Sequence, residues 1–160
     1  MVILYRIISI FINFIALMFA ISLVMSLPVL LSSPLNLLSS FIIVSIVLYS
    51  WFSYKFSRSV LQLKQPVKPN LRDWIRVNGI VAIIYCIMVI IAVSFLLIMP
   101  QIFTELIKSM PGDLPIAEAD LKKVFIVMLV YAIMLLTHVI LTFILMKKHH
   151  AVFTAIKENP

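Results

Sequence analysis

The sequence predicts an all-α integral membrane protein, a four-helix bundle made of two antiparallel transmembrane hairpins with short loops. Two observations predict this class. First, 64% of the residues are apolar and only 12% are charged, whereas soluble domains are about half apolar and a quarter charged. Second, the apolar residues gather in four long runs. Because one bilayer crossing needs about 20 mostly apolar residues, four crossings occupy most of the 160 residues, and we expect residues 1–160 to form one transmembrane domain.

The first two apolar runs form the first predicted hairpin. The first span covers about residues 3–31, and because its apolar core is longer than that of a cleavable signal peptide, we expect it to be retained. Ser33 and Pro34 suit the N-cap and first position of the second helix, which spans about residues 35–56. That helix ends in aromatic side chains of the kind that favour the membrane interface, namely Tyr49, Trp51, Phe52, Tyr54 and Phe56.

A polar, basic connector of about residues 57–74 joins the two hairpins. Pro66 and Pro69 break helical structure there, and Asn70 with Asp73 resembles a capping box that begins the third helix. The basic residues in and beside this connector are Lys55, Arg58, Lys64, Lys68, Arg72 and Arg76.

The second hairpin comprises a third span over about residues 75–99, which stops at Pro100, and a fourth over about residues 124–146. Between them, residues 100–123 form an external loop of mixed charge. Apolar residues at helical spacing predict a short amphipathic helix in this loop, and they are Ile102, Phe103, Leu106, Ile107 and Met110. Pro111 and Gly112 end that helix.

Charge sets the predicted orientation. Short cytoplasmic loops carry an excess of Lys and Arg, and placing the connector in the cytoplasm puts ten of the 13 basic residues on that side. Both termini are then cytoplasmic, and we expect a plasma membrane, the bacterial cytoplasmic (inner) membrane. The connector charge is interpreted as this topology signal together with contact to anionic lipid headgroups, and not as a nucleic-acid site, because apolar residues alternate with the basic ones.

Small and polar residues within the spans are the informative ones, because apolar side chains gain little by choosing a helix over lipid. One stripe on the first span and a weaker one on the third predict the tightest helix contact; they comprise Ser9, Asn13, Ala16 and Ala20, and Gly79, Ala82, Cys86 and Val93. A possible buried polar layer near mid-membrane comprises Asn13, Ser45, Tyr85 and His138.

His138 is the sharpest single candidate, because an ionisable residue within a bilayer usually faces the bundle interior. The structural interpretation is that a hydrogen bond from Asn13 or Tyr85 satisfies a neutral imidazole, which then pins the fourth helix to the first. The functional interpretation is a proton or ligand site.

Chemical motifs are scarce. No Asp or Glu falls within a predicted span, and no metal-ligand spacing, phosphate loop or paired nucleophile and base occurs. We therefore expect no catalytic residue, metal or cofactor. The sequence favours a non-enzymatic structural or accessory component that associates through its helices with itself or a larger membrane complex. The alternatives are a small transporter or channel subunit, with a pathway between protomers lined by Asn13, Tyr85 and His138, and a lipid-handling membrane enzyme.

Overall fold

The computed structural model describes residues 2–26, 34–65, 67–109, 118–149 and 151–154, and all regular structure within them is helical. Four helices are long and apolar enough to cross a membrane; they are α1 (Val2–Met25), α3 (Pro34–Phe56), α4 (Pro69–Ile98) and α6 (Glu118–Lys148). The shorter elements are the π-helix η1 (Ser57–Gln62), α5 (Pro100–Ser109) and α7 (Ala151–Thr154). The predicted all-helical class is confirmed, with an apolar helix at each of the four predicted spans.

Prolines begin three of these helices. Pro34, Pro69 and Pro100 are the first residues of α3, α4 and α5, a position where the missing N–H removes no intrahelical hydrogen bond. Lys68 and Met99 precede two of these prolines and have ψ angles of 138° and 86°, in keeping with the exclusion of helical geometry before proline. Proline therefore fixes these helix boundaries.

Helical structure extends into the predicted connector from both sides. α4 begins at Pro69 with Lys68 as its N-cap, so the capping box expected from Asn70 and Asp73 is wrong; proline takes the first helical position instead. On the other side, α3 continues as η1, where the Leu63 amide donates to the Arg58 carbonyl at 3.1 Å.

The expected N-cap Ser33 and the expected breaks at Pro66, Pro111 and Gly112 lie outside the described residues. The expected helix in the external loop has a counterpart in α5. The Phe103 ring of α5 is buried and packs edge-on against Phe125 of α6 at 5.7 Å, with the Lys122 ammonium 5.3 Å from its centroid.

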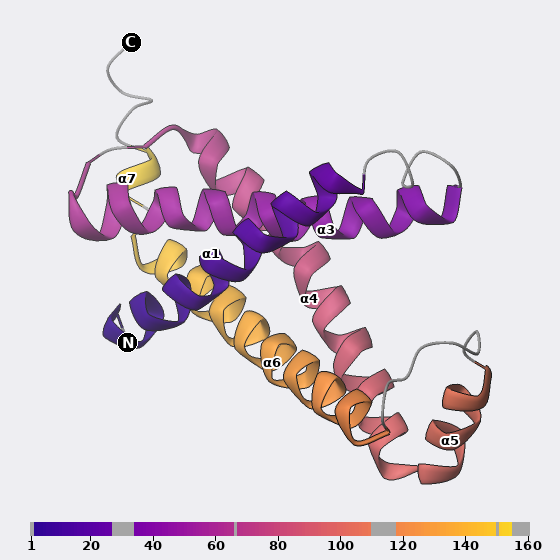
Figure 1. The fold of residues 1–160 in the computed structure, drawn as a ribbon. Helices are drawn as coiled ribbons and strands as arrows, with labels where there is room; N and C mark the ends of the chain where they lie inside the picture. Colours follow the sequence, from indigo (N-terminus) through magenta and orange to yellow (C-terminus); the bar gives the residue numbers. More distant parts are fainter. Residues whose placement is uncertain (1, 27–33, 66, 110–117, 150, 155–160) are drawn as a thin grey trace.

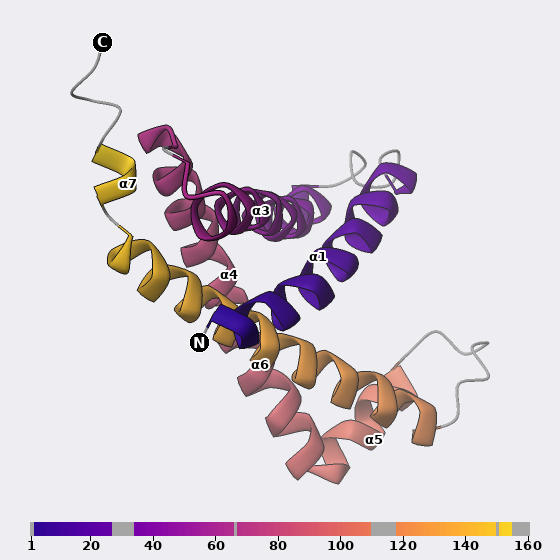
Figure 2. The same ribbon diagram turned by 90° about the vertical axis from the view of Figure 1, so that its left-hand side faces the viewer.

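The four long helices form a ring. α4 has the most extensive contacts, with α6 on one side and α3 on the other, and α1 packs on α3 and less extensively on α6. Figures 1 and 2 show α1 crossing α3, so that α1 and α4 lie on opposite sides of the ring. In Figure 1 the start of α1 and the ends of α3 and α6 lie on the left, whereas α5 lies at the far right.

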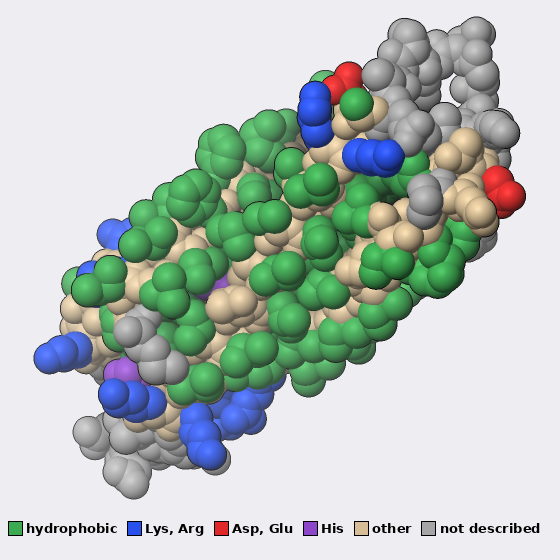
Figure 3. Space-filling model, turned by 90° about the horizontal axis from the view of Figure 1, so that it is seen from below, with side chains coloured by type: hydrophobic (Ala, Val, Ile, Leu, Met, Phe, Trp, Pro, Cys, Tyr) green, Lys and Arg blue, Asp and Glu red, His purple; other side chains and the backbone are tan. Residues whose placement is uncertain are grey.

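The outer surface of the ring is mostly apolar. At most 28% of the most apolar stretch of each long helix is buried inside the structure, and exposed Ile, Leu, Val, Met and Phe side chains occur along all four helices. Figure 3 shows this apolar surface as a broad band, with most of the visible Lys and Arg at one end, and with Asp and Glu beside further Lys or Arg at the other. Soluble monomers rarely expose contiguous apolar patches of more than a few hundred Å².

Candidate functional site

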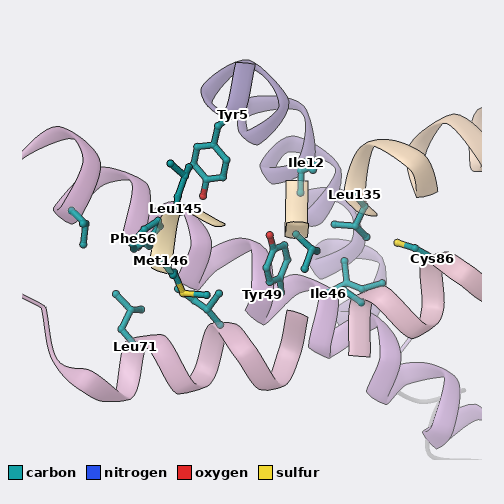
Figure 4. Close-up of a cluster of buried hydrophobic side chains, with 14 of the residues drawn as sticks. Tyr5, Ile12, Ile46, Tyr49, Phe56, Leu71, Cys86, Leu135, Leu145 and Met146 are labelled. Atoms are coloured by element: carbon teal, nitrogen blue, oxygen red, sulfur yellow. The ribbon is translucent and has the colours of Figure 1, made fainter. Parts of the chain in front are cut away.

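A cluster of buried polar side chains lies where α1, α3 and α6 meet, and we call it the polar cluster. Its members are Tyr5 of α1, Tyr49 and Ser53 of α3, and His138 and Thr142 of α6, each at most 1% exposed. On α3 and α6 the two members are four residues apart, which places them on one helix face. Figure 4 shows the Tyr5 and Tyr49 side chains entering the interior from α1 and α3.

Hydrogen bonds join all three helices in this cluster. The Tyr49 hydroxyl lies 2.8 Å from both His138 Nδ1 and Thr142 Oγ1, which links α3 to α6 twice. The Tyr5 hydroxyl lies 2.8 Å from Ser53 Oγ and links α1 to α3. A longer contact of 3.5 Å between Thr142 Oγ1 and the Tyr5 hydroxyl connects the Tyr5–Ser53 pair to the group formed by Tyr49, His138 and Thr142.

Counting protons assigns the tautomer of His138. Thr142 donates its one hydroxyl proton to the His138 carbonyl, 2.7 Å away on the same helix. The 2.8 Å contact between Tyr49 and Thr142 therefore needs the Tyr49 proton, because two oxygens without a proton between them repel. Tyr49 then accepts from His138, so the neutral imidazole carries its proton on Nδ1. His138 Nε2 is buried and has no hydrogen-bond partner among the described residues.

The His138 ring is also held by aromatic contacts. Tyr5 stacks on it with centroids 4.6 Å apart and planes 9° apart, while Tyr49 meets it edge-on at 5.8 Å. Hydrogen bonds and ring contacts together fix this side chain between α1, α3 and α6. The members of the cluster are hydroxyls and one imidazole, and their observed hydrogen bonds cross-link the three helices.

The four residues of the expected polar layer have different surroundings. His138 belongs to the polar cluster, but its partner is Tyr49 and not Asn13 or Tyr85. The Asn13 amide group donates within α1, to the Ser9 carbonyl at 2.7 Å and the Ser9 hydroxyl at 3.1 Å. Ser45 is buried on α3, and Tyr85 is partly buried on α4.

The two expected small-residue stripes contact different helices. Gly79 of α4 faces α6, where an added Cβ would lie 2.9 Å from Phe143 Cζ, and Ala82, Cys86 and Val93 are buried. The α1 stripe faces α3 instead, with Asn13, Ala16 and Ala20 lining a groove between these helices. The expected contact between the two stripes is therefore not the main one, because α1 and α4 lie on opposite sides of the ring.

Sequence reasoning missed Tyr5, Tyr49 and Ser53. Tyr49 was expected at the membrane interface with its aromatic neighbours, yet it is fully buried, whereas Trp51 is 67% exposed. A polar residue every fourth position along the second span, Ser45, Tyr49, Ser53 and Ser57, is the signal that could have identified this inward face. All four of these side chains are buried.

The basic residues of the connector are mostly exposed. Lys55, Arg58, Lys64, Lys68 and Arg76 are exposed, and Arg72 is partly buried, with its Nε 3.5 Å from Asp73 Oδ1. Their side chains are therefore available to headgroups or solvent.

No protein-family model matches the chain, and no match was found among curated proteins or solved structures. The class of protein is defined by the fold itself, an all-helical chain with four helices long and apolar enough to cross a membrane.

Proposed function

We propose that this chain is a non-enzymatic, multi-pass component of the bacterial cytoplasmic membrane, with both termini in the cytoplasm. It serves as a structural or accessory subunit and associates through its transmembrane helices with itself or a larger membrane complex. The apolar outer surface supports membrane insertion, since lipid or another apolar helix is the partner that such a surface favours.

The observation that carries the structural role is the set of hydrogen bonds within the polar cluster that join three helices. Its hydroxyl groups and His138 Nδ1 bond to one another across three helices, and all five side chains are buried. Polar groups within a bilayer stabilise helix contacts when they find internal partners. The cluster therefore fixes the bundle, and association is left to the outer surface.

The distribution of charge supports the proposed orientation. The ends of α3 and α6, with the adjoining η1, lie at one end of the structure and carry Lys55, Arg58, Lys147 and Lys148. The helix α5 and the start of α6, which carry Glu105 and Asp120, lie toward the other end. An excess of Lys and Arg marks the cytoplasmic side of membrane proteins. The start of α1 and the end of α6 lie at the basic end.

Native mass spectrometry of the full-length protein, extracted in mild detergent without overexpression of other subunits, tests the proposal. A stable complex with a protein of different mass, or a homo-oligomer, is the expected result. A monomer that releases no protein partner on activation, together with hydrolytic or transfer activity on co-purified lipid, would overturn it in favour of a lipid-handling enzyme.

A small transporter or channel subunit is the second candidate, and the unpartnered His138 Nε2 favours it. A bare imidazole nitrogen within the bundle could accept a proton from a water-filled pathway. Proteoliposomes that trap a pH-sensitive dye provide the test. Proton flux that His138→Leu abolishes, while oligomeric state and thermal unfolding stay unchanged, would support a pathway; the absence of flux in the wild-type protein would exclude proton conduction.

A further inference from the structure

A groove runs along the outer face of the bundle between α1 and α3. Its first section has a volume of about 380 Å³ and is lined by Ala16, Leu17, Ala20, Val47, Ser50 and Trp51, together with Asn13 and Tyr54. The second section, of about 340 Å³, shares Asn13 and Tyr54 and continues past Ser9 to Arg6, Ser57 and Gln62. Each section falls within the usual size range of ligand-binding clefts, about 300–1,000 Å³.

The chemistry of the groove changes along its length. Apart from Asn13, Ser50 and Tyr54, the residues that line the first section are apolar. The second section still has a largely apolar lining surface, but it adds the polar residues Ser9, Ser57 and Gln62 and ends at Arg6. Arg6 is exposed and, in the part of the chain that the structure describes, forms no ion pair. One end is therefore suited to an anion and the other to an apolar chain.

The length of the groove matches half a bilayer. Arg6 and Ala16 both lie on α1, and at 1.5 Å per residue their separation along the helix is about 15 Å. The hydrocarbon core of a bilayer is about 30 Å thick, so this distance equals about one leaflet. With the basic end in the cytoplasm, Arg6 lies at headgroup depth and Ala16 near mid-membrane.

The π-helix η1 shapes the anionic end. Ser57 and Gln62 are its first and last residues, and both line the second section of the groove. In an α-helix, residues five apart point about 140° away from each other. The i→i+5 bonding of a π-helix brings such residues to nearly the same face, and π segments frequently occur at functional sites. The change of winding thus presents a hydroxyl and an amide beside Arg6.

An unsatisfied polar group lies in the apolar section. Ser50 lines the groove and is 2% exposed, and its Oγ has no hydrogen-bond partner among the described residues. Buried polar atoms normally have hydrogen-bond partners, so an unpartnered hydroxyl such as that of Ser50 beside a groove indicates a position where a ligand atom binds.

We propose that this groove binds one anionic phospholipid of the cytoplasmic leaflet, with its phosphate at Arg6, Ser57 and Gln62 and one acyl chain along Ala16, Ala20 and Trp51. The proposal rests on the proposed membrane insertion. The gradient from basic to apolar favours a lipid, because an anionic headgroup provides a charge partner for Arg6 and an acyl chain fits the apolar section. The site goes beyond general attraction of headgroups to the connector, because Arg6 lies outside that segment.

Quenching of Trp51 by brominated lipid tests the proposal directly. The chain has two tryptophans, so full-length Trp74→Phe protein reports from Trp51 alone, which is 67% exposed in the groove. The protein is reconstituted in mixtures of phosphatidylcholine and phosphatidylglycerol in which either lipid carries dibrominated chains. We expect phosphatidylglycerol to quench with at least about fivefold preference over its mole fraction, the factor that corresponds to one basic contact.

Three variants of the Trp74→Phe protein test whether Arg6 causes the preference for phosphatidylglycerol. Arg6→Gln should abolish this preference, and Arg6→Lys should retain most of it. Arg58→Gln removes another exposed cation, which belongs to η1 and does not line the groove, and it should leave the preference for phosphatidylglycerol unchanged.

The lipid site would be refuted if quenching of Trp51 in the Trp74→Phe protein were proportional to the mole fraction of the brominated lipid. An equal effect of Arg6→Gln and Arg58→Gln on the preference for phosphatidylglycerol would refute it too. Failure of every brominated lipid to quench Trp51 in protein that floats with the vesicles would show a protein partner or second copy in the groove, and would also refute it. Failure of the protein to float with vesicles would refute the proposed membrane insertion instead, so the two failures are distinguishable.

Discussion

Tyr49→Phe tests whether the polar cluster holds the bundle together. The substitution removes one hydroxyl and keeps the ring, so the edge-on contact with His138 is preserved while two 2.8 Å hydrogen bonds between α3 and α6 are lost. Because Tyr49 is fully buried, no solvent replaces the missing partner.

The expected loss is modest but measurable. Hydrogen bonds between helices in membrane proteins contribute about 0.6 kcal/mol on average and at most about 1.7 kcal/mol. Two such bonds give an expected decrease of about 1–2 kcal/mol in the free energy of unfolding, toward the upper end because His138 and Thr142 lose a partner while still buried.

Equilibrium unfolding in mixed detergent micelles, followed by tryptophan fluorescence and far-ultraviolet circular dichroism, measures this loss. Tyr54→Phe is the matched control, because Tyr54 lies on the same helix and is 47% exposed; a change within about 0.5 kcal/mol is expected there.

A double-mutant cycle separates the hydrogen bond from general packing. Tyr49→Phe combined with the isosteric Thr142→Val should show a coupling of about 0.6 kcal/mol. The reasoning fails if Tyr49→Phe costs no more than Tyr54→Phe, or if the two changes in the cycle are additive.

Two further substitutions probe other contacts of the bundle. Tyr5→Phe removes the bond to α3 but keeps the ring stack, so unfolding experiments should show a loss of about 0.6 kcal/mol; a loss above about 2 kcal/mol would contradict this. Gly79→Val places new atoms where even a Cβ lies 2.9 Å from the Phe143 ring, and should cost about 1–3 kcal/mol. Phe143→Leu should restore part of that loss in the double variant, and the absence of any rescue would show that the ring is not the obstacle.

The class of fold could be predicted because hydropathy and proline act locally. Four apolar runs correspond to four long helices, and Pro34 and Pro100 mark helix boundaries by removing amide donors. The helix partners could not be predicted in this way. The small residues Gly79, Ala82 and Cys86 of α4 are buried, but Asn13, Ala16 and Ala20 of α1 line a groove. The order of helices around the ring depends on contacts far apart in sequence.

The candidate site could be predicted only in part for the same reason. His138 stood out because an ionisable residue within a span is rare. Tyr49 did not, because tyrosine is equally compatible with an interfacial position, and its neighbour Trp51 faces outward while Tyr49 faces inward. Helical residues two positions apart, such as Tyr49 and Trp51, point about 160° away from each other, so a cluster of aromatic residues in sequence does not share one environment.

Cysteine accessibility provides the most direct test of the membrane arrangement on which the proposed function depends. Cys86 is the one cysteine of the sequence and is buried, so Cys86→Ala gives a background without thiols. Gln65→Cys probes the basic connector and Gln101→Cys the start of α5, and both positions are exposed. In intact bacterial cells, a membrane-impermeant maleimide should label Gln101→Cys, and should label Gln65→Cys only after lysis. Labelling of Gln65→Cys in intact cells, or equal labelling of both, would contradict four membrane crossings with a cytoplasmic basic face.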